Sequence, residues 1–146
     1  MQDLFLDTSI VKHFIPPMQP SYKELYTWLR STGTLVVSTK LKIEYIRGLS
    51  GHQGDSIIVL IDFLTRKGRL NEINSDRIKN FKIKKGIKRR MRSNVEDHHH
   101  IITILLSNRK LAVSADANFR HDVNLQPTID GIKPFASHSP SKLTYK

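Results

Sequence analysis

Apolar runs of the length of buried strands recur along the chain, and stretches with helical spacing of apolar residues separate them. The runs predict strands at residues 4–6, 35–38, 70–73 and 111–114. A fifth strand is expected at residues 132–135, at a sheet edge because Pro134 cannot donate a backbone hydrogen bond. Helical spacing predicts helices at residues 22–29, 39–49, 56–67 and 95–108, the first with a capping box at Ser21 and Glu24.

This alternation of strands and helices indicates an α/β fold with a mostly parallel sheet that is buried on both faces. A length of 146 residues suits one domain, and no internal repeat or linker divides residues 1–146. In such folds the functional crevice lies outside the carboxyl ends of the strands. The residues that directly follow each strand are therefore the first candidates for function.

Charge is concentrated in one stretch of the chain, residues 66–92, which we call the basic segment. It holds twelve Lys and Arg against two acids, so almost all of the net charge of +11 lies there. A basic block beside a nearly neutral body indicates a polyanionic partner, most simply nucleic acid. A solvated loop is the alternative interpretation, but apolar residues such as Ile78 and Phe81 predict that part of the segment is helical and docked.

The rest of the composition excludes several classes of protein. The chain has no cysteine, so neither a disulfide framework nor a thiolate metal site can form. The longest aliphatic run, residues 57–61, is too short to span a bilayer. The first residues lack the basic and apolar regions of a secretory signal, and a cytoplasmic location is therefore expected.

Two aspartates close predicted strands. Asp7 follows the first strand, and its plainest role is an N-cap for a helix that begins near Ser9. Asp116 follows the strand at residues 111–114, where an Asx turn toward Asn118 would account for it. Each structural role is sufficient alone, but both side chains also lie where a parallel sheet places its functional crevice.

Two further acids lie on predicted helices, on the faces that carry apolar residues. Glu44 shares its stripe with Leu41 and Tyr45, where a carboxylate is costly unless it is paired or binds a metal. A salt bridge to Lys40 or Arg47 is the alternative. Asp97 lies on the face of its helix that points toward the sheet, whereas Glu96 is rotated about 100° away.

Four carboxylates converging on one crevice would repel one another and force some to protonate. A hard divalent cation removes that conflict, because Mg²⁺ and Mn²⁺ prefer oxygen ligands. Beside a strongly basic segment, such an acidic pocket indicates hydrolysis of a phosphodiester bond, with the cation activating water.

The residues quoted so far resemble the PIN-domain ribonuclease family. The resemblance covers residues 4–9, the helix that bears Glu44, residues 96–101 and residues 111–119. It implies a three-layer α/β/α sandwich with a central parallel sheet and a metal-dependent nuclease, mostly acting on RNA, that leaves 5′-phosphates. Carried over residue by residue, it implies that the catalytic and metal-binding set is Asp7, Glu44, Asp97 and Asp116, with support from Ser114 and Asn118.

The resemblance also implies partners. Many small bacterial members are toxins paired with an antitoxin protein, and homodimers are common among them. RNA is the expected substrate, DNA is not excluded, and the residues expected to bind the nucleic acid are Lys82, Lys84, Lys85, Lys88, Arg89, Arg90 and Arg92. A non-catalytic nucleic-acid-binding module with the same fold is the alternative function.

Three consecutive histidines, residues 98–100, follow Asp97. Successive helix positions lie about 100° apart, so the three imidazoles cannot all bind one ion. We therefore expect a surface or interface cluster, while a role for His98 or His100 near a phosphate stays open.

Overall fold

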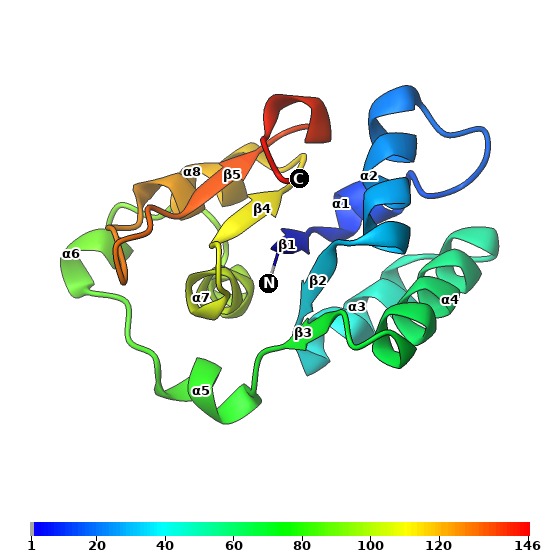
Figure 1. Ribbon diagram of the computed structural model, residues 1–146. Coiled ribbons are helices and arrows are strands. Elements are labelled where there is room, and N and C mark those ends of the chain that lie inside the picture. The colour runs from blue at the N-terminus through cyan, green and yellow to red at the C-terminus, as the bar shows by residue number, and fades with distance from the viewer. Residues whose placement is uncertain (1) are drawn as a thin grey trace.

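The computed structural model describes residues 2–146 and shows a central sheet of five parallel strands between two layers of helices (Figure 1). The strand order is β3-β2-β1-β4-β5, and every pairing is parallel. The strands are β1 (Asp3–Leu6), β2 (Thr34–Val37), β3 (Leu70–Glu72), β4 (Leu111–Val113) and β5 (Phe135–Ser137). The predicted three-layer α/β sandwich is thus confirmed, and β5 is an edge strand as expected.

Helices α2, α3 and α4 pack together on one side of the sheet, and α7 lies on the other side, where it contacts α5 and α8 (Figure 1). The helices are α1 (Thr8–Val11), α2 (Pro20–Ser31), α3 (Thr39–Gly48), α4 (His52–Arg66), α5 (Ser75–Asn80), α6 (Lys85–Lys88), α7 (His98–Leu106) and α8 (Ala117–Leu125). Two 3-10 turns complete the list, η1 (Val95–Asp97) and η2 (Pro140–Lys142).

The core lies along the two central strands. Every residue of β1 and β2 is buried, because helices cover both faces of a parallel sheet. Leu4, Phe5 and Leu6 are fully buried and form the middle of the core. Among residues 2–146, no helix is both long and apolar enough to cross a membrane.

Two local predictions are wrong, and one helix was missed. The helix expected to start with a capping box at Ser21 begins instead at Pro20, whose fixed φ and missing N–H suit the first helical position, and no side chain caps it. The last strand begins at Phe135, because Ile132 pairs with Ile129 across a tight turn instead. Helix α8 was not predicted, since only Phe119, Val123 and Asp122 of it are buried.

The basic segment is ordered, and part of it is helical as predicted. Ile78 of α5 is buried in the core, and Phe81 packs against it. The end of the segment is held by Asp122 of α8, whose carboxylate accepts hydrogen bonds from the backbone N of Arg92 and of Ser93, both at 2.7 Å. The segment thus begins at the end of α4 and in β3, and its later part is attached to the α7–α8 side of the fold through α5 and Asp122.

Candidate active site

The topology creates a crevice between β1 and β4. From β1 the chain first builds β2 and β3 on one side of the sheet, and only then returns to add β4 and β5 on the other. The carboxyl ends of β1 and β4 therefore flank the point where the strand order reverses, which is where open parallel sheets bind ligands. Asp7 follows β1 there, and Ser114 follows β4.

Asp7 is held in place by hydroxyl groups from both sides of this crevice. Its Oδ2 accepts hydrogen bonds from Ser114 Oγ at 2.7 Å and from Ser9 Oγ at 2.8 Å. Its Oδ1 accepts a hydrogen bond from Thr8 N at 2.9 Å, so the predicted N-cap role is also real. Asp7 is half-buried. The carboxylate is therefore positioned by three donors and still reaches solvent.

Asp116 is the N-cap of α8 and is exposed. Its Oδ1 accepts hydrogen bonds from Asn118 N at 2.9 Å and from Phe119 N at 3.2 Å, which is the expected Asx geometry. Asp116 N donates in turn to Ser114 Oγ at 3.1 Å, and the same hydroxyl donates to Asp7. Ser114 thus links the two strand-end aspartates. Asn118 itself is exposed.

Glu44 on α3 is paired, but neither with Lys40 nor with Arg47. A contact of 2.7 Å joins Glu44 Oε2 to His100 Nε2 of α7, and because a carboxylate can only accept, Nε2 carries the proton. The Glu44 side chain is 42% exposed and the His100 side chain 5% exposed. Lys40 donates instead to Glu96 O at 3.0 Å and so fastens η1 to α3.

The expectation of a surface histidine cluster is wrong for His100, which is buried against the Phe5 ring with the ring centroids 5.9 Å apart. His98 and His99 are half-buried. Burial lowers the pKa of His99, and the neighbouring His100 and Lys40 lower it further. The three imidazole rings therefore lie in different environments. All three are on α7, where successive side chains point in different directions.

Asp97 is the carboxylate whose pKa is affected by the other three candidate acids. Its pKa is raised, first by burial and then by the negative charges of Asp116, Asp7 and Glu44, against a lowering effect of His100. Asp97 is half-buried and Glu96 exposed, so the acid expected to face inward does so. Asp97 therefore lies within electrostatic range of the other three predicted carboxylates.

Tyr45 follows Glu44 on α3 and lies in the core. It is fully buried, and its hydroxyl donates to the backbone oxygen of Leu6, directly before Asp7. Burial raises the pKa of Tyr45 well above its usual value, and the charges of Asp7 and Glu44 add to that effect. The phenol is therefore a neutral donor that ties α3 to the end of β1.

The four carboxylates fit a hydrated cation better than a closed metal cage. Among residues 2–146, no three His, Asp or Glu side chains are arranged to hold a metal ion directly. Mg²⁺, however, keeps several waters and is often bound through only one or two carboxylates together with substrate phosphates. Hard oxygen donors within electrostatic range of one another suit Mg²⁺ or Mn²⁺ on that basis.

All seven cations expected to bind nucleic acid are exposed: Lys82, Lys84, Lys85, Lys88, Arg89, Arg90 and Arg92. They lie on the α6 stretch of the basic segment, which the Asp122 contacts secure to α8. The chain then continues through η1 directly to Asp97. The cations and the acidic crevice are thus joined by a short, anchored connection.

Sequence reasoning missed three residues that organise this region. Ser9 holds Asp7, and its position two residues after a strand-end aspartate was a usable signal. His100 holds Glu44, and its place one helical turn after Asp97 put it on the inward face. Asp122 could not be found, because its function depends on the unpredicted helix α8.

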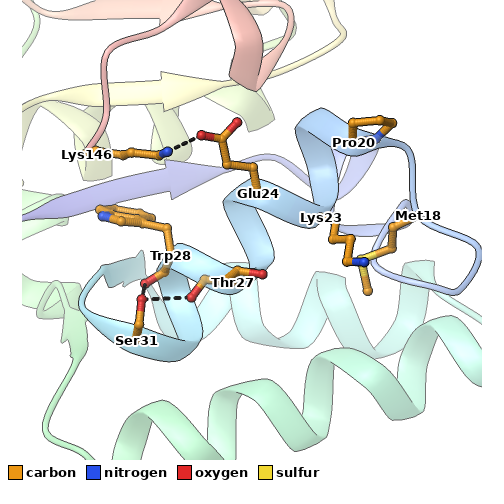
Figure 2. A pocket seen from close by; sticks show the side chains of 8 residues that line it. All are labelled: Met18, Pro20, Lys23, Glu24, Thr27, Trp28, Ser31 and Lys146. Atoms are coloured by element: carbon orange, nitrogen blue, oxygen red, sulfur yellow. Dashed lines mark hydrogen bonds and ion pairs between the residues drawn. The ribbon is translucent and has the colours of Figure 1, made fainter.

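A separate cavity of about 730 Å³ lies on α2 and contains none of the four carboxylates. Figure 2 shows it between Met18 and Lys23 at one end and Lys146, paired with Glu24, at the other. Trp28 borders it but is buried, with its ring packed edge-on against Tyr145 at 4.9 Å. Trp28 is therefore a core residue rather than an exposed stacking platform.

No family model, no curated protein sequence and no solved structure matches this chain.

Proposed function

We propose that this protein is a metal-dependent endoribonuclease whose active centre is formed by Asp7, Glu44, Asp97 and Asp116. The observation that carries the proposal is that Asp7 and Asp116 meet through Ser114 at the crevice between β1 and β4. The charges of Asp116, Asp7 and Glu44, which raise the pKa of half-buried Asp97, support it. Such a cluster is unfavourable without a cation, and clusters of this kind are typical of functional sites.

The chain's own residues would prepare the site before substrate arrives. Ser9 and Ser114 orient Asp7, and His100 orients Glu44, so hydrogen bonds fix two of the four carboxylates. A bound Mg²⁺ or Mn²⁺ would supply charge neutralisation at the phosphate and acidify a water molecule. Exposed cations of the basic segment would hold the RNA backbone as point charges.

The decisive experiment compares wild type with Asp116→Asn on end-labelled single-stranded RNA, with Mn²⁺ or with EDTA. Asp55→Asn is the matched control, because it makes the same change at an exposed position on α4. We expect cleavage by wild type and by Asp55→Asn that EDTA abolishes and that Asp116→Asn lacks. Cleavage that survives in Asp116→Asn would place the active centre elsewhere. A single-stranded DNA arm tests whether the activity discriminates between the two nucleic acids.

A non-catalytic RNA-binding module is the second candidate, favoured by one observation. Asp7 and Asp116 already accept hydrogen bonds from the protein, and no three side chains within residues 2–146 form a metal cage. Titration calorimetry with Mn²⁺ separates the two functions. Binding that Asp7→Asn abolishes supports the nuclease, whereas RNA binding without any Mn²⁺ binding supports the module.

Protein partners follow from the same proposal. As the resemblance to small nuclease toxins implies, the protein would be the toxin of a toxin–antitoxin pair, would work in the cytoplasm inhibited by an antitoxin protein, and would form homodimers. Exposed apolar side chains on α3 and α4, Ile43, Ile46, Ile58 and Val59, offer a surface for such contacts. Light scattering of the purified chain measures whether it is dimeric, and purification from its native host shows whether a small protein accompanies it.

A further inference from the structure

A groove of about 260 Å³ lies where the basic segment meets the loop that follows α8. Phe81, Ile83 and Ile87 of the basic segment line one wall, and Pro127 and Ile129 contribute to the other. Figure 1 shows α6 beside the loop that leads from α8 to β5. The volume is just below the about 300 Å³ at which pockets for drug-sized ligands begin, so it suits a single flat ring system.

The loop wall of this groove is built rigidly. Asp130 and Gly131 both have positive φ, 51° and 76°, and form a two-residue turn that pairs Ile129 with Ile132. The two backbone hydrogen bonds of that pair are 2.9 and 3.0 Å long. Lys133 then donates to Asn124 O at 2.7 Å, which fastens the turn to the end of α8. The groove therefore exists before any ligand binds.

Charge surrounds the apolar floor. Lys82 and Lys84 line the groove, and both are exposed. Lys85, Lys88 and Arg89 follow immediately on α6 and its C-cap, also exposed. An apolar slot that contains an aromatic ring and is rimmed by cations is the arrangement that binds single-stranded nucleic acid, with bases on the apolar surface and phosphates on the lysines.

We propose that this groove binds one nucleobase of a single-stranded RNA, with the base against Phe81 and Ile83 and the flanking phosphates on Lys82 and Lys84. The identity of the ligand rests on the proposed ribonuclease function. The position of the groove is consistent with that function, because α8 has nine residues and so spans about 13 Å between Asp116 and the loop wall. A strand seated in the groove can therefore run along the α8 side toward the acidic crevice.

The test measures RNA binding without catalysis. Fluorescence anisotropy with a labelled oligouridylate of about 12 nucleotides, in EDTA, gives the affinity for RNA. Displacement by inorganic polyphosphate gives the affinity for a backbone without bases. Thr128→Met narrows the groove from an exposed wall position without adding an aromatic ring, and Phe81→Leu removes the aromatic face but keeps an apolar side chain for the core. Thr65→Met makes the same substitution on exposed α4 and is the matched control.

Thr128→Met and Phe81→Leu are each expected to weaken RNA binding by about 5- to 150-fold, because each prevents one base from stacking on Phe81. Their affinity for polyphosphate and their circular dichroism spectra stay at wild-type values, and Thr65→Met changes neither affinity. Unchanged RNA affinity in both groove variants overturns the groove proposal and leaves the nuclease proposal standing. An equal loss for RNA and polyphosphate also overturns it, because the groove would then sense only phosphate. Failure of wild type to bind RNA overturns the groove proposal, whereas the cleavage assay with Mn²⁺ decides the nuclease proposal.

Discussion

The buried carboxylate of Asp122 makes the hydrogen bonds whose removal should have the most direct structural consequence. It is fully buried and accepts hydrogen bonds from the backbone N of Arg92 and of Ser93, from the Ser93 hydroxyl and from His121 Nδ1. These four bonds hold the end of the basic segment on α8. Asp122→Asn keeps the shape but replaces one acceptor oxygen by an NH₂ donor and removes the charge.

The magnitude follows from the donors that lose their partner. At least one buried N–H then faces another donor, at a desolvation cost of about 1–3 kcal/mol, and hydrogen bonds to a charged acceptor are each worth about 1.5–3 kcal/mol. We therefore expect Asp122→Asn to lower the free energy of unfolding by about 2–4 kcal/mol. Urea denaturation followed by circular dichroism measures the change. Asp130→Asn, the same substitution at an exposed position, is expected to change it by less than about 0.5 kcal/mol.

The effect depends on pH in a defined direction. Burial alone would raise the pKa of Asp122, but the hydrogen bonds from Ser93, His121 and Arg92 outweigh burial and lower it. A carboxylate with a depressed pKa stabilises the fold in full above its unfolded-state pKa of about 3.9, and that contribution is lost as the pH falls through the folded pKa. The stability gap between wild type and Asp122→Asn should therefore be constant near neutral pH and shrink below about pH 4.

Hydrogen exchange gives an independent readout of the same contact. The amide protons of Arg92 and Ser93 donate to Asp122 in the native state, so they should exchange faster in Asp122→Asn, while amides of the central strand β1 change only with global stability. Equal unfolding free energies, together with unchanged exchange at Arg92 and Ser93, would refute the assigned anchoring role.

Three further predictions concern packing, the acidic site and the basic segment. Gly33→Ala should destabilise the fold by about 1–3 kcal/mol in thermal or urea unfolding, because the added Cβ would lie 2.6 Å from ring atoms of buried Trp28; a stability equal to wild type would show that the indole moves freely. His100→Leu should weaken Mn²⁺ binding about 10- to 100-fold by calorimetry, whereas His100→Gln keeps a donor for Glu44 and should stay closer to wild type; equal affinity in all three proteins would remove His100 from the positioning of Glu44. RNA affinity should fall with salt by about 0.7 log units per log unit of salt for each phosphate neutralised. Lys88→Gln should lower that slope if Lys88 contacts a phosphate. A flat salt response would exclude the basic segment from RNA binding.

Short-range pattern was sufficient for the central strands. The runs at residues 4–6, 35–38 and 111–114 are apolar on both faces, and only a sheet covered on both sides accommodates such runs. Helix α8 was not predicted because its sequence is largely polar. The cap at Asp116 and buried Asp122 hold this helix in place. The last strand was misplaced because the turn at Asp130 and Gly131 claims Ile132 for a local pairing.

The residues of the candidate site also fall into those that could be predicted from the sequence and those that could not. Asp7 and Asp116 could be named from the sequence alone, because the residues after parallel strands share one edge of the sheet whatever the details of packing. Glu44 and Asp97 could be assigned to inward faces from helical periodicity. Their partners could not, since the side chain that meets Glu44 comes from α7, 56 positions further along the chain.

The layer architecture, the two strand-end aspartates and the concentration of positive charge are readable in the amino-acid order, because they depend on local periodicity and composition. The folded chain alone shows that His100 is buried beside Glu44, that Ser9 and Ser114 share Asp7, and that the basic segment and the loop after α8 enclose a groove. Such contacts depend on how helices dock across the sheet, and docking is set by the packing of the whole core rather than by any one segment.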